Sequence, residues 1–301
     1  MDAHAGTAGR WSERAIELIR HVQQTQAGAI ATAARWSCEA IAAGGLVHMY
    51  GSGHSRIAVE EMFPRYGSFP GFHPIVELST TFHTQVVGAN GQRQAMYIER
   101  TSGLAEVILS NFAFGEQDVM VVFSVSGTSA VAVEMAQGAR RRGLRTIAVT
   151  SGAAAPADPD ADHLAHFADL VIDIGTPPGD ALVSVPGLDE PVGPGSTAAT
   201  VAVVNELKVQ TAELLVERGI RPPVLTAASV IGAERSAELF DAAYDQHAQR
   251  LARAIGGAGA ARRSAAAENR SGEVGLDPGA AAAVDEPGWY PAAPSNLDRN
   301  R

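Results

Sequence analysis

Two short segments rich in serine and glycine each follow an apolar run, and both carry groups that bind anions. Residues 51–55 read Gly-Ser-Gly-His-Ser and follow the run 46–50, while residues 124–129 read Ser-Val-Ser-Gly-Thr-Ser and follow the run 119–123. Backbone N–H groups at a helix N-terminus, together with serine hydroxyls, form a neutral cradle for phosphate. Both segments are therefore predicted to be phosphate-binding turns. The candidate contacts are Ser52, His54, Ser55, Ser124, Ser126, Gly127 and Ser129.

Two other interpretations of these turns are less favourable. Serine often caps a helix, but one serine per turn would be enough for capping and each turn holds more than one. A dinucleotide-binding fingerprint would need a third glycine where Arg56 stands. The Walker pattern Gly-x4-Gly-Lys-Ser/Thr is absent from the chain. Binding of a phosphate group outside these nucleotide motifs is the favoured interpretation.

Proton transfer beside a carbonyl of a bound ligand would need a carboxylate or an imidazole close to these turns. Glu61 lies on the helix predicted after the first turn, and Glu60 points about 100° away from it on that helix. Glu99 lies just before a later predicted helix, and His83 lies in a segment without a clear period. Glu61, Glu99 and His83 are candidate catalytic residues. Solvated positions for the paired glutamates and a structural role for the histidines stay open as alternatives.

Lys208 is the only lysine of the chain and falls on the apolar face of a predicted helix. A lysine in that position must snorkel, pair with an acid, or be stabilised by a bound anion. Glu206 is two residues away and diverges from it on a helix. Lys208 is therefore a candidate site residue. Asp180, in Pro-Gly-Asp-Ala, is predicted either to accept a hydroxyl group of the substrate or to hold its own loop.

Alternating strands and helices are predicted to position these residues. Apolar runs at 46–50, 119–123, 146–150 and 170–174 are typical of strands buried on both faces, and 73–78 predicts a fifth strand. Helices are expected over 11–43, as one long helix or two joined ones, and over 104–114, 196–217 and 232–254. Residues 79–98 are predicted to form a loop or short hairpin, and 175–195 an ordered surface loop.

This order of elements predicts a doubly wound, three-layer α/β/α fold with a mostly parallel five-stranded sheet. Ligands of such sheets bind beyond the carboxyl ends of the strands, where both serine-rich turns fall. Residues 11–255 are expected to form one domain. The flanking segments 1–10 and 256–301 are predicted to be disordered, because small and polar residues bury too little apolar surface to offset the entropy of ordering.

Composition excludes several classes of partner. The net charge is −10, and no stretch is rich in both basic and aromatic residues, so nucleic acid is not an expected partner. No apolar run is long enough to span a bilayer, so no membrane association is expected. A single cysteine, Cys38, rules out an intrachain disulfide and fits a reducing compartment, the cytoplasm. The nine histidines show no metal-ligand spacing, so neither a metal nor another cofactor is predicted.

The two turns also carry a family resemblance. Ser124-x-Ser126-Gly127-x-Ser129 resembles the phosphate-binding signature of the SIS (sugar isomerase) family, and residues 51–55 match that family's first loop. The stretches VEEMFPRYG and ADLVIDIGTPPGDALV, among others, resemble a bacterial group of single-SIS-domain proteins over roughly residues 12–254. That group often reads Ser-x-Ser-Gly-Arg-Asn in the second turn. Here Thr128 and Ser129 replace the last two residues, which removes a possible cationic contact with the substrate.

The resemblance implies a flavodoxin-like fold, a phosphorylated sugar as ligand, no cofactor, and assembly as a homodimer or tetramer. In phosphoheptose isomerase, histidines at the offset of Glu61 and near that of Lys208 belong to the active site. The N-acetylmuramic acid 6-phosphate etherase has a catalytic carboxylate in the region of Glu99. The expected function is that of a lyase acting on an N-acetylated amino-sugar 6-phosphate by removal of the C2 proton and β-elimination at C3. An aldose–ketose isomerase and a non-catalytic sugar-phosphate sensor are the alternatives.

Overall fold

Five parallel strands form a central sheet in the order β2-β1-β3-β4-β5. The computed structural model describes residues 7–81, 91–152 and 162–256. This strand order is that of the flavodoxin-like doubly wound fold and confirms the predicted fold class. The strands of the sheet are β1 Val47–Gly51, β2 Phe72–Ile75, β3 Val119–Phe123, β4 Arg145–Thr150 and β5 Leu170–Asp173.

The central strands are continuous apolar runs because helices cover both faces of the sheet. All five residues of β1 and of β3 are buried, and the two strands pair in register from Val47 opposite Val119. Alternate residues of β3 enter different cores: Val121 packs in the core on one face and Val122 in that on the other. This arrangement fixes both ends of β1 and β3, and with them the positions of the turns that follow.

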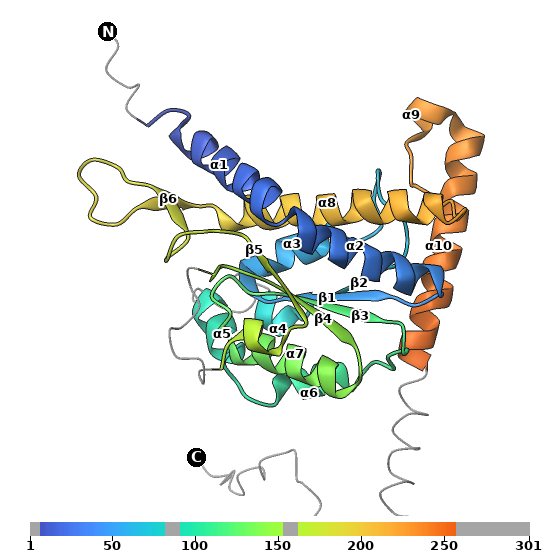
Figure 1. Cartoon of the computed structure of the whole chain (residues 1–301), viewed down its shortest axis with the longest axis horizontal. Coiled ribbons are helices and arrows are strands. Elements are labelled where there is room, and N and C mark those ends of the chain that lie inside the picture. Colours follow the sequence, from blue (N-terminus) through green and yellow to red (C-terminus); the bar gives the residue numbers. More distant parts are fainter. Residues whose placement is uncertain (1–6, 82–90, 153–161, 257–301) are drawn as a thin grey trace, which may run out of the picture. The chain divides into compact units, whose positions relative to one another are not determined.

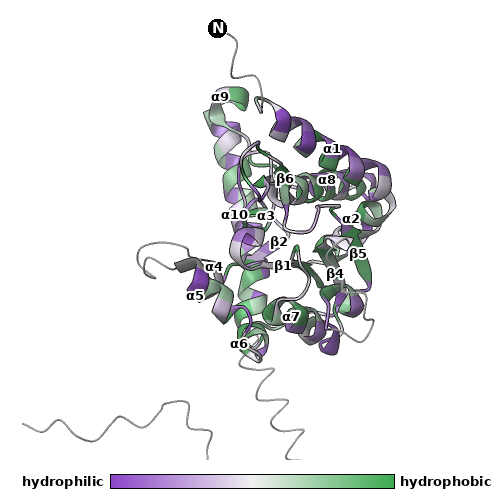
Figure 2. Cartoon of the chain, turned by 90° about the vertical axis from the view of Figure 1, so that its left-hand side faces the viewer, coloured by the Kyte–Doolittle hydropathy of each residue, from purple (hydrophilic) through white to green (hydrophobic). Residues whose placement is uncertain are grey.

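Helices from distant parts of the chain form the two outer layers (Figure 1). One layer contains α1 Arg10–Thr25, α2 Ala27–Ala42, α3 Arg56–Glu60 and α8 Ser196–Glu217, and the other contains α6 Leu104–Leu109 and α7 Ala130–Arg141. The predicted 11–43 region is thus two helices, interrupted at Gln26. Figure 2 shows α2 and β5 as largely hydrophobic, whereas α1 exposes much hydrophilic surface.

Two further helices complete the C-terminal part of the described chain. After α8 come α9 Ala228–Ile231 and the long α10 Ala233–Gly256. The predicted helix over 232–254 is confirmed by α10. This helix runs along the right-hand side of the molecule in Figure 1, at the side where β1 begins, and α5 and β6 lie on the left.

Three local expectations were wrong. The region 79–98, expected as a loop or hairpin, contains the helices α4 Leu78–Thr81 and α5 Gly91–Ile98, which are too short to show a clear helical period. The helix expected over 104–114 ends at Leu109, because Phe112 and Phe114 turn inward against buried histidine rings. The loop over 175–195 holds a two-stranded antiparallel pair, β6 Ala181–Val183 and β7 Val192–Pro194.

Some expectations fall on parts of the chain outside the described residues. These are the predicted disorder of the first six residues and of residues 257–301, and the candidate site residue His83.

Candidate functional site

The two serine-rich turns lie at the point where the order of the sheet reverses. From β1 the chain first adds β2 on one side and later β3 on the other, so β1 and β3 are neighbours although the chain does not follow that order. Connections leaving their carboxyl ends in opposite directions open a crevice between them. The turn 51–55 follows β1 and the turn 124–129 follows β3, so both border this crevice, as predicted.

A cavity of about 480 Å³ occupies the crevice. Its wall combines the two turns, the end of α5, the residue after β4, the loop before β6 and the start of α8. The lining residues are Ser52, Gly53, His54, Ser55, Ala95, Met96, Glu99, Ser124, Val125, Ser126, Ser129, Ser151, Pro177, Pro178, Gly179, Asp180 and Ser196. Most polar side chains in this set are serines, which suits a ligand with many oxygen atoms.

The hydroxyls of the turns do not cap their own helices. Ser52, Ser55 and Ser129 occupy N-cap positions, and none of the three accepts a side-chain capping bond. The first turn also requires close backbone approach, because a Cβ on Gly51 would lie 2.8 Å from the carbonyl oxygen of Ser55. The interpretation of these serines as simple helix caps is therefore wrong.

Ser52 and Glu99 form a hydroxyl–carboxylate pair in the cavity. The Ser52 hydroxyl donates to Oε2 of Glu99 at 2.6 Å, and Ser52 is largely buried. The main chain of Glu99 is held as well, because its carbonyl accepts from the Ser129 hydroxyl at 2.9 Å and from the Val131 N–H at 3.0 Å. Glu99 is thereby tied to both turns, and its carboxylate lies in the cavity wall at a defined position.

The second turn is held by its own serines. The Ser124 hydroxyl accepts from the Gly127 N–H at 3.2 Å, and the Ser126 hydroxyl accepts from the Thr128 N–H at 3.4 Å. Gly127 has a φ of 67°, in the left-handed region that glycine adopts without strain. The predicted Ser124, Ser126 and Ser129 line the cavity, while Gly127 shapes the turn behind them.

Asp180 belongs to the cavity wall and also holds the start of α8. Its Oδ1 accepts from the N–H groups of Gly195 and Ser196 at 3.1 and 2.7 Å, and its Oδ2 accepts from the Ser196 hydroxyl. A carboxylate at a helix N-terminus satisfies otherwise unpaired N–H groups and is favoured by the helix dipole. Of the two alternatives predicted for Asp180, this geometry shows the loop-holding contact.

Glu61 and Lys208 lie together, away from the lining residues. Lys208 is 5% exposed, and its ammonium donates to the Glu61 carbonyl at 3.3 Å and lies 3.8 Å from that residue's carboxylate. Glu61 also pairs with Arg65 at 2.6 Å. Burial lowers the pKa of Lys208, while Glu61 opposes that shift. The pair joins the end of α3 to α8, which accounts for a lysine on an apolar helix face.

Sequence reasoning placed His54 and Ser55 in the site, and both line the cavity. It missed Ser151, Ser196 and the buried His163. Ser151 follows β4 directly and donates to the Thr176 carbonyl at 2.7 Å. Its position after an apolar strand is the same signal that identified the two turns, so Ser151 could have been found. Ser196 and His163 have no such local signal.

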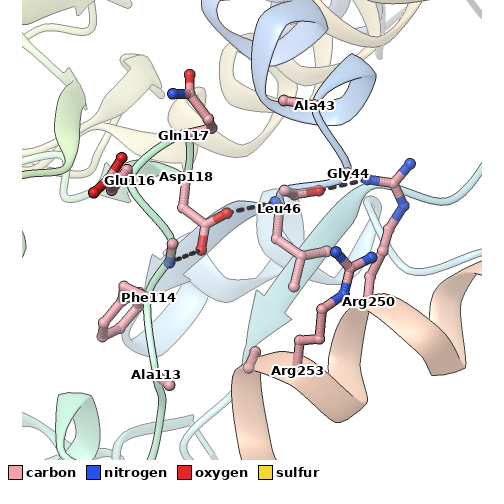
Figure 3. Close-up of a pocket in the computed structure, with 13 residues that line it drawn as sticks. Ala43, Gly44, Leu46, Ala113, Phe114, Glu116, Gln117, Asp118, Arg250 and Arg253 are labelled. Carbon is pink, nitrogen blue, oxygen red and sulfur yellow. Dashed lines mark hydrogen bonds between the residues drawn. The ribbon is translucent and has the colours of Figure 1, made fainter. Parts of the chain in front are cut away.

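A second cavity, of about 280 Å³, lies at the opposite edge of the sheet (Figure 3). Two of its charged side chains, Arg250 and Asp118, hold the fold. Arg250 donates to the carbonyls of Gly45 and Ile41 at the end of α2, and Asp118 accepts from the N–H groups of Leu46 and Gly115. This edge therefore offers structural contacts rather than an open set of ligand-binding groups.

No group of three or more His, Cys, Asp or Glu side chains in residues 7–81, 91–152 and 162–256 is arranged to hold a metal ion. In the same residues, no helix is both long and apolar enough to cross a membrane.

Known proteins are similar in sequence to this chain over most of its length. A UPF0309 protein of Streptomyces griseus is 32% identical over 229 residues, which covers 75% of this chain and 90% of that protein. The chain belongs to the UPF0309 family. A UPF0309 protein of Geobacillus kaustophilus is also 32% identical, over 67% of this chain and 80% of the relative. A family model described as the SIS domain matches residues 10–151, a range that contains both serine-rich turns of this UPF0309 chain.

Some solved structures are also similar to this UPF0309 chain. A phosphoheptose isomerase from Francisella tularensis is 17% identical, with a TM-score of 0.45, over 67% of this chain and 95% of that one. The sugar isomerase domain of an RpiR transcription factor from Sphaerobacter thermophilus is 20% identical, with a TM-score of 0.42, over 76% and 93%.

Proposed function

We propose that the cavity binds a phosphorylated amino sugar and that Glu99 removes the proton from its C2 carbon. The observation that carries the proposal is the placement of the Glu99 carboxylate beside Ser52, in one cavity with both serine-rich turns. The phosphate would lie against the second turn, at the N-terminus of α7, where helix N–H groups and hydroxyls accept negative charge. The sugar would then extend toward the first turn and Glu99.

The charge distribution supports a neutral mode of phosphate binding. No lysine or arginine is among the described residues that line the cavity. The two lining carboxylates are Glu99 and Asp180, and the charge of Asp180 is offset at the start of α8. Serine hydroxyls and N–H groups are thus left to bind the phosphate, as expected where Thr128 stands in place of the arginine that the similar bacterial group often has.

The proposed reaction is elimination of water, or of another C3 substituent, from an N-acetylated amino-sugar 6-phosphate in its open-chain form. Glu99 takes the C2 proton, and the electrons of that bond form the C2–C3 double bond as the C3–O bond breaks. The leaving oxygen takes up a proton, and we propose His54, which lines the cavity, as its donor. The apolar part of the wall, including Met96, Pro177 and Pro178, would contact the acetyl group.

An aldose–ketose isomerase is the second candidate, because it would need Glu99 alone and not the proton donor that the elimination requires of His54. Isomerisation needs a single base that moves a proton between C2 and C1, whereas elimination also needs an acid at C3. Glu99 is the one lining carboxylate, among the described residues, that does not hold a helix start. Both candidates begin with the same loss of the C2 proton.

The test is incubation of the protein in deuterated water with N-acetylglucosamine 6-phosphate, N-acetylmuramic acid 6-phosphate, glucosamine 6-phosphate and fructose 6-phosphate, followed by proton NMR. Loss of the C2 signal with a new vinyl signal would support the lyase. Exchange at C2 of an aldose, or at C1 of fructose 6-phosphate, with formation of the other sugar isomer would support the isomerase. Thermal stabilisation by a sugar phosphate without any exchange would contradict both and leave a non-catalytic sensor.

The proposal also includes the cellular location and the oligomeric state of the protein. We place the chain in the cytoplasm as a homo-oligomer, on the basis of its single buried cysteine and of the exposed apolar residues Trp11, Ile16 and Ile19 on α1. Sedimentation of the purified protein tests the assembly: a monomer at micromolar concentration would contradict it.

A further inference from the structure

A buried histidine lies directly behind the second turn. His163 has no exposed surface and precedes η4 Leu164–Phe167, a short 3-10 helix that packs against α7. It is not among the cavity-lining residues, and no strand or helix pattern in the sequence singles it out. The two nitrogens of its ring, however, form hydrogen bonds with the backbone of the second turn, at Ser126, and of η4, at Ala165.

The contacts of His163 define its tautomer. Nδ1 accepts a hydrogen bond from the Ala165 N–H at 3.2 Å, so the ring proton is on the other nitrogen. Nε2 therefore donates to the carbonyl oxygen of Ser126, at 3.1 Å. Burial lowers the pKa of His163, which keeps the ring neutral. A neutral ring in this tautomer satisfies one donor and one acceptor of the backbone at the same time.

Gly127 makes room for this ring. A Cβ at Gly127 would lie 2.1 Å from Nε2 of His163, a distance at which atoms overlap. The carbonyl of Gly127 accepts from the Leu164 N–H at 2.8 Å. Two successive carbonyls of the turn, those of Ser126 and Gly127, are thus held from behind by the segment that begins at His163.

Holding these carbonyls determines where the N–H groups point. In a trans peptide the C=O and the following N–H point in opposite directions. The Ser126 carbonyl faces His163, and the Gly127 N–H therefore faces Ser124. In the next peptide the Gly127 carbonyl faces Leu164, and the Thr128 N–H therefore faces the Ser126 hydroxyl. The carbonyl oxygens, which repel an anion, are kept away from the serine hydroxyls that line the cavity.

We infer that His163 is a positioning residue, which orients the second turn for phosphate by holding the Ser126 carbonyl against its Nε2–H. The inference rests on the proposed function, since it concerns the phosphate-binding part of the same cavity. His163 does not touch the ligand. Its effect is on affinity for the phosphate group, through the direction of the Ser126–Gly127 and Gly127–Thr128 peptides.

Two substitutions separate the bond to Ser126 from the bond to Ala165. His163→Asn keeps an acceptor near the position of Nδ1 and removes the donor at Nε2, whereas His163→Gln keeps an amide donor near the position of Nε2. Titration calorimetry with N-acetylglucosamine 6-phosphate and with inorganic phosphate measures the effect. We expect Kd to rise about tenfold for His163→Asn, with unchanged stoichiometry, and His163→Gln to recover most of the affinity.

The matched control is His247→Asn, the same change at a half-buried histidine of α10, at the other edge of the sheet. It should leave Kd within about twofold of the wild-type value. A variant that is partly unfolded would bind with lower stoichiometry and an unchanged Kd, so misfolding and mispositioning give different results. Nitrogen-15 NMR of the wild-type imidazoles adds a test that needs no variant: His163 should carry its proton on Nε2.

The outcomes separate the inference from the function on which it rests. Wild-type protein that binds neither ligand would overturn the proposed function, and the inference with it. Wild-type binding together with equal binding by His163→Asn would overturn the inference alone. A proton on Nδ1 of His163, or a failure of His163→Gln to recover affinity, would overturn the assigned hydrogen bond.

Discussion

At the scale of single residues, the site depends on hydroxyls whose directions are set by their partners. Ser52 is turned toward Glu99, while Ser129 is turned toward the Glu99 main chain. The two serines therefore hold the proposed base, and the phosphate contacts that the sequence suggests for both stay predictions. Ser55 and Ser126 line the same cavity without a bond to Glu99.

Ser52→Ala should lower kcat about tenfold with little change in KM, because the Glu99 carboxylate loses the donor that orients it. Ser55→Ala, which removes a hydroxyl of the same turn, should instead raise KM. Steady-state kinetics on the substrate identified by NMR measure both. Equal losses in kcat for the two variants would show that the Ser52–Glu99 contact has no special part in the reaction.

The buried Lys208–Glu61 pair leads to a prediction on stability. Lys208→Met removes a buried charge while keeping most of the side-chain length, and should change the free energy of unfolding by less than about 1 kcal/mol. Glu61→Gln leaves the ammonium buried without a carboxylate and should cost about 2 kcal/mol. Urea unfolding of both variants checks the order. A loss of turnover greater than tenfold in folded Lys208→Met would return Lys208 to the catalytic residues.

At the scale of elements, the sequence predicts which residues follow the strands at the site, but it does not predict whether a residue on a later helix reaches that site. Parallel strands bring their carboxyl ends to one edge, so an apolar run followed by a serine-rich turn is enough to place Ser52 and Ser124 in one cavity. Glu61 was expected there because it follows the first turn closely. However, α3 is only five residues long, and its end packs against α8, so Glu61 faces Lys208 instead.

Contacts that join distant loops leave no pattern in the local amino-acid sequence. Asp180 reaches Ser196 only because β6 and β7 pair and bring the two ends of their segment together. The place of His163 behind Gly127 likewise depends on how η4 packs against α7. Neither neighbourhood follows from a period or a motif, since both are products of tertiary packing.

Asp180 accepts hydrogen bonds from the N–H groups at the start of α8, so its replacement should destabilise this helix. Asp180→Ala should lower the free energy of unfolding by about 2 kcal/mol, because α8 loses its cap and alanine is strained at the φ of 65° that residue 180 adopts. Asp180→Asn keeps an acceptor and tolerates that φ, so it should cost about half as much. Thermal unfolding compares the two; equal effects would contradict the capping role.

At the scale of the whole molecule, the two edges of the sheet have different tasks. The carboxyl edge holds the serine-rich cavity, whereas the amino edge is closed by α10 over a buried polar cluster. In that cluster His48 contacts Asp118 at 3.1 Å and His73 at 2.8 Å, and Arg250 of α10 is held at the neighbouring α2 end. The cluster makes the stability of the fold sensitive to acid.

Burial, followed by the neighbouring His48 and His247, lowers the pKa of His73 to about 3. In the unfolded chain the His73 ring takes up a proton near pH 6.5. The contribution of the neutral, buried ring to the stability of the fold is therefore complete above pH 6.5 and is lost as the pH falls toward 3. For His73 alone the loss at pH 5 is about 2 kcal/mol. His73→Gln should flatten the dependence of unfolding free energy on pH between 4 and 6.5, measured by urea unfolding. An unchanged slope would contradict a neutral, buried His73.

The central claim is that Glu99 is the base acting on a sugar phosphate in the serine-rich cavity. Its most direct test is the rate of C2 proton exchange of N-acetylglucosamine 6-phosphate in deuterated water, measured for wild type, Glu99→Gln and Glu61→Gln. The exposed Glu213→Gln serves as the control for the same change on the outer surface of α8. We expect exchange to fall at least a thousandfold in Glu99→Gln and to persist in the other two. Wild-type exchange that survives in Glu99→Gln but is lost in Glu61→Gln would contradict the account.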